Sequence, residues 1–265
     1  MMRIEIDYRG CRHVIDYQDS IRLSTRLDFA ENSVNLYGIT SASEEPLHYD
    51  TRIASVKRGG ASNASRISLV PHCHGTHTEC IGHILPERHH MADLDIPLFI
   101  PATLIRVSLQ RFSEMKDCYN SYADDIDWII TADAIEHALA PLGSDYLQAL
   151  VIATDNHDWL PDGIGAPYFS YQAISRLVEL GVQHLLVDIP SIDRLNDGGL
   201  MENHRCFWGI QDPHHPIEGR KSASVTELIK VPSNISAGHY ILSIQLPDLS
   251  GDALPSRPLL FPFSL

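Results

Sequence analysis

The chain has 265 residues, of which 44% are hydrophobic and 20% charged, and this composition is typical of a globular protein. Its formal net charge of −14 argues against nucleic acid or an anionic membrane as a partner, because both are bound by clustered Lys and Arg. No apolar run reaches the roughly 20 residues of a membrane span, and the N-terminus lacks the apolar core of a signal peptide. We therefore expect a cytoplasmic protein.

Five cysteines without regular spacing exclude a disulfide framework, whereas 15 histidines are an unusual number. Along the chain, apolar alternation or short apolar runs predict strands at 102–109, 146–153, 184–189, 224–231 and 239–246. No repeat and no long linker divides the chain. A single domain over 1–265 is the expected organisation.

Two helices are predicted between these strands. The first covers 131–139, with Thr131 as its N-cap and Pro141 just beyond its end. The second covers 170–180, with Ser170 as its N-cap and Gly181 at the position of a left-handed C-cap. The strand before the second helix, the helix and the strand after it form a β-loop-α-β unit. The fold class is α/β, a central mixed and barrel-like β-sheet with flanking helices.

Residues 71–83, PHCHGTHTECIGH, concentrate side chains that bind metal ions. They include four histidines, two cysteines and a glutamate, which are the ligand types of Zn²⁺ and its neighbours. In an extended segment, residues two apart face the same side, so His77 and Glu79 project together. Cys73 can join them after a turn at Gly75. A solvated loop that gathers these residues by accident is the competing interpretation.

This segment resembles the H-x-G-T-H-x-D-x-P-x-H signature of the cyclase family of metal-dependent hydrolases, which includes bacterial kynurenine formamidase and isatin hydrolase. The resemblance continues through YLQALVIATDNHDW at 146–159, through 170–193 with its end GVQHLLVDIPSID, and through 224–257 with TEL and PSRP. It covers about residues 27–262 and leaves 1–26 as an N-terminal extension. It implies the swivelling β/β/α fold of that family.

The resemblance also implies a site for one or two divalent ions, with Zn²⁺ expected first and Mn²⁺ as the alternative. Aligned on the motif, Cys73, His77 and Glu79 match ligands, and His83 matches a histidine with a proposed acid/base role. Two distal ligands of the family fall on His204 and Glu227. The resemblance further implies a homodimer or homotetramer.

The residues themselves support Glu227 independently of the family. Val225, Glu227, Ile229 and Val231 share one face of the predicted strand, and a carboxylate on an apolar face is costly unless it is paired or ligating. If that face is not buried, Glu227 is simply solvated. Without the resemblance, His204 reads as a surface histidine.

Three departures from the family pattern concern the metal. Cys73 stands in place of the first histidine, between His72 and His74, either of which could replace it after a shift of register. Glu79 is one methylene longer than the motif aspartate, which would displace an ion or remove one. The spacing from His204 to the distal carboxylate is longer than usual, with an insertion near 211–223.

Two further groups have open interpretations. At the end of the strand at 184–189, Asp188, Ser191 and Asp193 form a turn or orient metal ligands, and the turn is favoured. Aromatic side chains near loops line either a substrate pocket or the core; these are Trp159, Tyr168, Phe169 and Trp208.

The expected function is metal-dependent hydrolysis of an amide-type C–N bond, in a formamide or a cyclic amide, of a small carbonyl compound. Two other classes stay open. One is a non-catalytic, ligand-binding relative. The other is a non-haem iron oxygenase, since His77, Glu79 and His204 have the composition of its two-histidine, one-carboxylate site.

Overall fold

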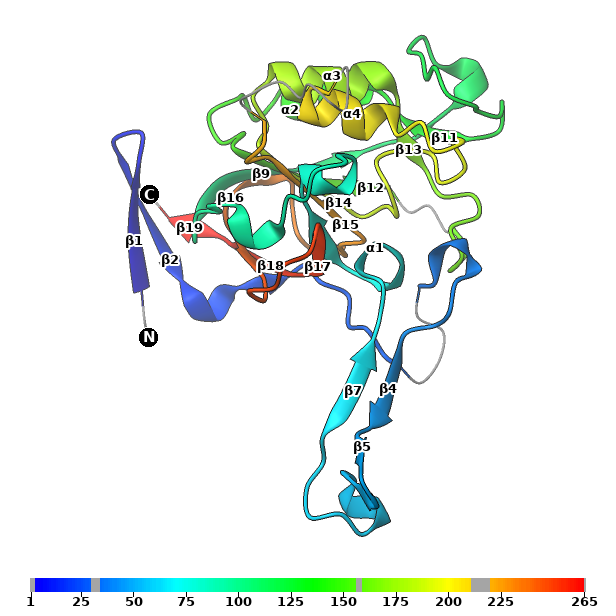
Figure 1. Cartoon of the computed structure of the whole chain (residues 1–265). Coiled ribbons are helices and arrows are strands. Elements are labelled where there is room, and N and C mark those ends of the chain that lie inside the picture. Colours follow the sequence, from blue (N-terminus) through cyan, green and yellow to red (C-terminus); the bar gives the residue numbers. More distant parts are fainter. Residues whose placement is uncertain (1–2, 30–33, 156–158, 211–219, 265) are drawn as a thin grey trace.

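The computed structural model describes residues 3–29, 34–155, 159–210 and 220–264 (Figure 1). The polar residues 156–158 and most of the expected insertion lie outside these ranges. In the part that is described, no helix is long and apolar enough to cross a membrane.

A curled sheet of nine strands forms the centre of the fold. Its strands, in spatial order, are β17 (Ala253–Pro255), β8 (His77–Glu79), β15 (Ser224–Glu227), β14 (His184–Val187), β12 (Ala149–Thr154), β9 (Ile100–Val107), β16 (Gly238–Gln245), β18 (Arg257–Phe261) and β3 (Ile21–Arg22). The contiguous strands β15, β14, β12 and β9 are parallel, and the pairs outside them are antiparallel. This confirms the mixed, barrel-like sheet expected from the sequence. β3 belongs to this sheet although it lies within the expected extension 1–26.

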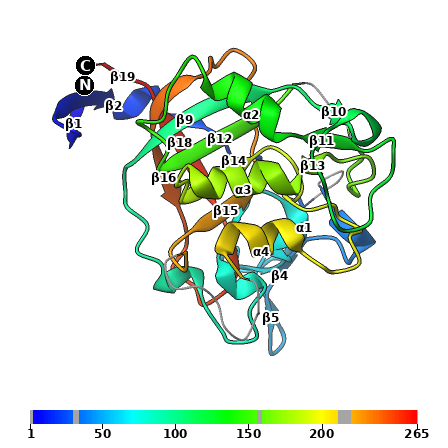
Figure 2. The ribbon, with the colours of Figure 1, turned by 90° about the horizontal axis from the view of Figure 1, so that it is seen from above.

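Four α-helices lie among the described residues: α1 (Pro71–His74), α2 (Ala132–Leu139), α3 (Tyr171–Glu179) and α4 (Glu202–Trp208). Figure 2 shows α2, α3 and α4 side by side over one face of the sheet. Both predicted N-caps are confirmed, because Thr131 Oγ1 accepts the N–H of Ala134 and Ser170 Oγ accepts the N–H of Ala173. Gly181 has the expected left-handed backbone, with φ of +79°.

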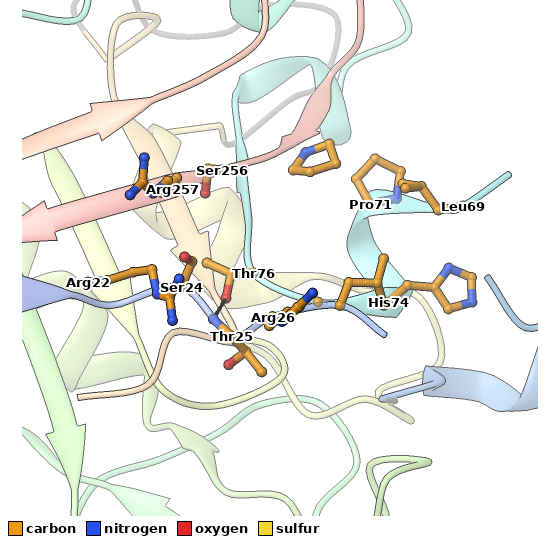
Figure 3. Close-up of a pocket in the computed structure, with 13 residues that line it drawn as sticks. Arg22, Ser24, Thr25, Arg26, Leu69, Pro71, His74, Thr76, Ser256 and Arg257 are labelled. Carbon is orange, nitrogen blue, oxygen red and sulfur yellow. Dashed lines mark hydrogen bonds between the residues drawn. The ribbon is translucent and has the colours of Figure 1, made fainter. Parts of the chain in front are cut away.

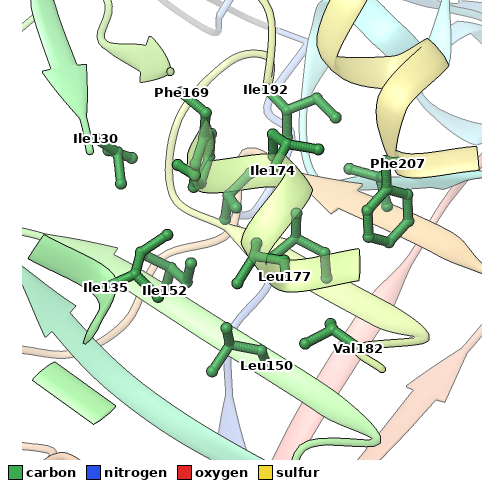
Figure 4. Close-up of a cluster of buried hydrophobic side chains, with 14 of the residues drawn as sticks. Ile130, Ile135, Leu150, Ile152, Phe169, Ile174, Leu177, Val182, Ile192 and Phe207 are labelled. Atoms are coloured by element: carbon green, nitrogen blue, oxygen red, sulfur yellow. The ribbon is translucent and has the colours of Figure 1, made fainter. Parts of the chain in front are cut away.

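The sheet is covered on both faces, so its central strands are apolar on both sides. On β12, Leu150 and Ile152 pack under the helices, in the cluster drawn in Figure 4. Their neighbours Ala149 and Val151 point into a second apolar cluster on the opposite face. This double burial explains why the strand is a continuous apolar run rather than an alternating one.

The strand around Glu227 is shorter than predicted. β15 ends at Glu227, and Leu228 adopts a left-handed backbone with φ of +58°. Because this residue interrupts the alternation, Val225 packs in the helix-side cluster while Ile229 packs in the cluster on the other face. The predicted common face of Val225 and Ile229 is therefore wrong, although the carboxylate between them is buried.

The remaining strands form small sheets at the periphery. β1 (Arg3–Tyr8) pairs with β2 (Cys11–Asp16), and β2 pairs with β19 (Phe263–Ser264), which joins the two ends of the chain. A third sheet contains β10 (Gln110–Arg111), β11 (Trp128–Ile130) and β13 (Tyr168–Phe169).

An extended arm, residues 43–68, projects away from the body of the molecule (Figure 1). Its two antiparallel pairs are β4 (Ser43–Pro46) with β7 (Ser65–Ser68), and β5 (His48–Tyr49) with β6 (Arg52–Ile53). The arm leads directly into the segment that carries α1 and β8.

Candidate metal centre

The strands β8 and β15 bring the first two candidate ligands together. They pair antiparallel, with His77 opposite Glu227, and His77 Nε2 lies 3.4 Å from Glu227 Oε2. Glu79 follows two residues later and shares the face of His77, as the alternation predicts. The side chain between them, Thr78, points the other way and its hydroxyl meets Thr226 Oγ1 at 2.8 Å.

Helix α4 supplies the third candidate ligand. His204 is only 1% exposed, so it is a buried residue and not a surface histidine. Its Nε2 lies 2.9 Å from Glu79 Oε1 and 3.7 Å from Glu227 Oε1. Residues 79 and 204 are far apart in the sequence. They become neighbours because α4 packs over the part of the sheet that carries β8 and β15.

The helical turn α1 decides which residue of the segment 72–74 faces this cluster. Successive side chains on a helix point about 100° apart, so neighbouring residues cannot face the same side. His72 faces the cluster, with Nδ1 3.1 Å from Glu79 Oε2. Cys73 instead packs against Leu36 and Leu228. His74 is buried, and its Nδ1 accepts the N–H of Val70 at 2.9 Å.

Several groups of these residues lie close enough to share an ion. Among the described residues, the sets with ligand atoms within 4.8 Å of one another are His72, His77 and Glu79; Glu79, His83 and His204; and His72, His83 and Asp252. Neither Cys73 nor Glu227 is in any of them, although Glu227 lies 3.4 Å from His77 Nε2 and 3.7 Å from His204 Nε2. At the position expected for Cys73, the side chain that faces the cluster is that of His72, one of the two alternatives that the sequence left open.

Asp252 is a residue of this cluster that the sequence analysis missed. Its Oδ2 lies 2.8 Å from His72 Nε2 and 3.6 Å from His83 Nδ1. It sits in the loop just before β17, the strand that flanks β8. A single aspartate in a loop carries no sequence pattern, and only the pairing of β17 with β8 brings it here.

The favoured turn at Asp193 is present, since its N–H donates to Ser191 Oγ at 3.2 Å, and its side chain also contacts the candidate ligand His204. Its carboxylate is 2% exposed and accepts the His204 Nδ1–H at 2.6 Å and the Tyr119 hydroxyl at 3.0 Å. It also accepts the backbone N–H groups of Asn203 and His204. This arrangement fixes the ring of His204 and directs Nε2 toward the two glutamates, as a carboxylate behind a metal-binding histidine does.

The donor set fits a divalent cation. His77 Nδ1 donates to the Gly75 carbonyl at 2.9 Å, so the lone pair of its neutral ring is on Nε2. That Nε2 is a buried atom without a hydrogen-bond partner in the described part of the chain, and the contacts of the buried Glu79 Oε2 there are ion pairs with the imidazoles of His72 and His83. Two fully buried carboxylates, Glu79 and Glu227, also need compensating positive charge.

The electrostatics of the cluster agree with that need. Burial alone would raise the pKa of Glu79, but the charges of His83 and His204 outweigh it and hold this pKa well below its usual range. Burial likewise opposes the charge on His204, while Glu79 and Asp193 raise the pKa of its ring well above the ordinary value. Protons on the imidazoles therefore compensate the carboxylates, and a cation would compete with them for the same atoms.

A cavity of about 210 Å³ opens onto this cluster. Apolar side chains line part of its wall, including Leu36, Ile84, Leu195 and Met201, and His72, His83, His204 and Glu227 line its polar side. Tyr37 also lines it, from a turn in which this residue has a left-handed backbone with φ of +62°. The cavity can hold a small molecule with one apolar face against the histidine and carboxylate groups.

The four aromatic residues expected at a pocket lie elsewhere. Phe169 and Trp208 are core residues under the helices, and Trp208 Nε1 donates to the Ala223 carbonyl. Tyr168 is buried and donates its hydroxyl to Asp127, and Trp159 packs near Leu36 and Leu195. None of the four is among the described residues that line the cavity at the cluster. Phe169 and Trp208 fill the core, whereas Trp159 and Tyr168 each line another cavity.

A model of one protein family matches this chain. The Cyclase family model matches residues 21–194, which is more than half of the chain. The chain belongs to the Cyclase family. That match contains the segment 71–83 and agrees with the resemblance found from its motif.

Curated relatives of this chain are kynurenine formamidases. The one from Geobacillus thermodenitrificans is 29% identical over 222 residues, which cover 82% of this chain and 88% of the relative. The one from Bacillus cereus is 25% identical over 187 residues, covering 69% and 78%.

Solved structures share the fold. An isatin hydrolase bound to the product analogue thioisatinate has a TM-score of 0.60 at 15% identity, with 93% of each chain covered. A predicted metal-dependent hydrolase from Bacillus stearothermophilus has a TM-score of 0.57 at 16% identity, covering 91% of this chain and 97% of that chain.

Proposed function

We propose that this chain is a metal-dependent hydrolase that cleaves the C–N bond of a formamide or a cyclic amide in a small carbonyl compound. The observation that carries the proposal is the buried cluster of imidazoles and two glutamates, part of which lines a cavity of about 210 Å³. Membership of the Cyclase family, with kynurenine formamidases among its relatives and an isatin hydrolase of the same fold, supports the choice of bond.

The proposed ligand set is His72, His77, Glu79, His204 and Glu227. A divalent ion held by these groups would polarise the substrate carbonyl as a Lewis acid and would lower the pKa of water to about 7. We propose Zn²⁺ first and Mn²⁺ second. The proposed set contains the imidazole of His72 instead of the Cys73 thiolate. Because thiolate is the ligand that most favours Zn²⁺, this set is more compatible with Mn²⁺ than the expected one.

His83 is the proposed acid and base. Its ring lines the cavity, with Nδ1 3.6 Å from the Asp252 carboxylate and Nε2 3.8 Å from Glu79 Oε2. We propose that the Nδ1 proton of His83 faces Asp252, which leaves Nε2 to take a proton from the attacking water. Water adds to the carbonyl carbon, the C–N bond breaks, and His83 returns the proton to the leaving nitrogen. The products are a carboxylate and an amine.

Removal of the metal tests the reaction. We expect dialysis against a chelator to abolish turnover of formanilide and isatin, and addition of Zn²⁺ or Mn²⁺ to restore it. Turnover should proceed at the same rate under nitrogen, whereas dependence on dioxygen would indicate the oxygenase chemistry. Full activity in a metal-free sample would exclude this mechanism, and a protein that binds no transition metal would be a non-catalytic relative.

The variant His83→Gln separates metal binding from proton transfer. We expect it to keep its metal, measured by elemental analysis, and to lose about 100- to 10,000-fold in kcat, the usual contribution of a positioned acid/base group. The matched control is His48→Gln, an exposed histidine on the arm, which should leave both properties unchanged. Loss of metal together with activity in His83→Gln would instead identify His83 as a ligand.

We also propose that the chain forms a homodimer or a larger homo-oligomer. The arm supports this, because a two-stranded ribbon is only marginally stable when it stands alone in water. The arm and its root expose several apolar side chains, Leu47, Tyr49, Val56, Ile67 and Val70. A second copy that covers them would bury this apolar surface, and the cytoplasm is the proposed location of the assembly.

A further inference from the structure

A second cavity, of about 320 Å³, lies on the other side of α1 from the metal cluster. Three separate segments enclose it: residues 22–27, residues 69–76 and residues 255–257 (Figure 3). The first of these is joined to the second by the N–H of Thr25, which donates to Thr76 Oγ1 at 2.9 Å. The cavity is therefore a defined feature of the fold between the root of the arm and the edge of the sheet.

The charged groups at this cavity all have the same sign. Arg22, Arg26 and Arg257 line it, and no carboxylate is among the described residues of its wall. Neither Arg22 nor Arg26 forms a side-chain hydrogen bond or ion pair within the described ranges, and Arg257 has only a long contact to Gln245 at 3.4 Å. In a chain with a net charge of −14, three arginines gathered without an acidic partner are a local exception.

Buried polar atoms at the same cavity are donors. Because His74 Nδ1 accepts the N–H of Val70, the proton of its neutral ring is on Nε2. This Nε2 belongs to a side chain that is 3% exposed, and it has no hydrogen-bond partner in the described structure. Ser256 Oγ is likewise buried and lacks a partner there. A buried donor without an acceptor is costly, so these groups indicate an acceptor that comes from outside the chain.

We propose that this cavity binds a small anionic molecule through its carboxylate or phosphate oxygen atoms. The arginines provide the charge, and His74 Nε2–H and the Ser256 hydroxyl provide hydrogen bonds to the oxygen atoms. Figure 3 shows Arg22 and Arg257 at one end of the cavity and His74 at the other, so it accommodates more than a single small ion. An adjoining cavity that shares Arg26 and His74 with this one is also lined by Asp28, Asp188 and Lys230, so its charge is mixed and it is less suited to an anion.

The site is independent of the proposed reaction, since binding is measured without turnover. Two probes distinguish the source of the oxygen atoms: inorganic phosphate, and glutarate as a small dicarboxylate. We expect saturable binding of at least one of them by titration calorimetry on the metal-loaded protein, and weaker binding at higher ionic strength. Absence of saturable binding of both probes at millimolar concentration would overturn the proposal.

The double variant Arg22→Gln/Arg26→Gln locates the binding. Both side chains are exposed, so the fold should tolerate their loss, and the affinity for the better probe should fall at least tenfold. The matched control is Arg12→Gln on β2, also an exposed arginine but outside the cavity wall, which should bind as the wild type does. A probe-induced shift of the His74 ring signals by NMR is expected in the wild type. Unchanged affinity in the double variant would place the anion elsewhere and refute the site.

Discussion

At the scale of single residues, the centre depends on which atom of each imidazole faces the carboxylates. A backbone carbonyl takes Nδ1–H of His77, and the Asp193 carboxylate takes Nδ1–H of His204. Both rings therefore direct Nε2 toward the two glutamates. His72 is the exception, because its Nδ1 faces Glu79 while Nε2 contacts Asp252. Hydrogen bonds behind the ring orient each ligand as much as its position in the sequence does.

The replacement of Cys73 by His72 gives a direct test. We expect His72→Asn to lower metal affinity about 10- to 100-fold, the effect typical of disturbing a metal-binding imidazole and its partners. Cys73→Ser should change metal affinity little, because this side chain packs with Leu36 and Leu228 instead of facing the cluster. Competition with a chelating dye measures both. A large loss in Cys73→Ser, with none in His72→Asn, would restore the thiol to the ligand set.

At the scale of secondary-structure elements, the site lies where the sheet changes from parallel to antiparallel pairing. The parallel strand β15 ends at Glu227 and the short strand β8 runs back beside it. A strand of three residues cannot be recognised by its periodicity, yet its neighbours fix it on both edges. On its other side β15 pairs with β14, and this pairing buries His184, whose Nδ1 meets Ser224 Oγ at 2.9 Å.

His184 should make the stability of this strand pair depend on pH. Burial lowers the pKa of its ring from 6.5 to about 4, so the folded chain holds the neutral form. Its contribution is fully present above pH 6.5 and is lost as the pH falls toward 4, because the unfolded chain then binds the proton first. The loss can reach about 3 kcal/mol. We expect the free energy of unfolding, from urea titrations, to fall over this range.

The variant His184→Gln is the control for that effect. It removes the titrating group, so its free energy of unfolding should be lower than that of the wild type at pH 7 and should change less between pH 6.5 and 4. An identical pH dependence in the two proteins would assign the acid sensitivity to other groups, such as the buried carboxylates of the metal cluster.

At the scale of the whole molecule, the arm and the body have different sources of stability. The body has two apolar clusters on the two faces of one sheet, whereas the arm at 43–68 has exposed apolar side chains along a narrow ribbon. The arm is continuous with the segment that carries α1 and β8. Only the base of the arm is therefore close to the metal cluster, and the rest of it projects away from the body (Figure 1).

The oligomeric state tests the role of the arm. We expect the wild type to sediment as a dimer or a larger species, and the double variant Val56→Lys/Ile67→Lys to shift toward the monomer, since both side chains are more than half exposed and would have to be buried beside a partner. Leu249→Lys, an exposed apolar residue of similar accessibility outside the arm, is the matched control. A monomeric wild type would exclude the proposed assembly.

The sequence alone determined the family, the order of the main strands and helices, and the segment that carries the ligands. These features are local: helix caps at Thr131 and Ser170, apolar runs, and the spacing of His77, Glu79 and His83. The family is confirmed by the match over 21–194, and the mixed sheet by its strand pairing. The single domain over 1–265 stays a prediction.

Only the tertiary structure decided which side chains meet. The directions of the His72 and Cys73 side chains depend on α1, a single turn of helix. Hydrophobic periodicity cannot predict this turn, because four residues are too few to show a pattern. The placement of Asp193 and Asp252 depends on the packing of α4 and on the pairing of β17 with β8. A sequence determines local conformation through neighbouring residues, but a metal centre assembled from distant segments exists only after the sheet has closed.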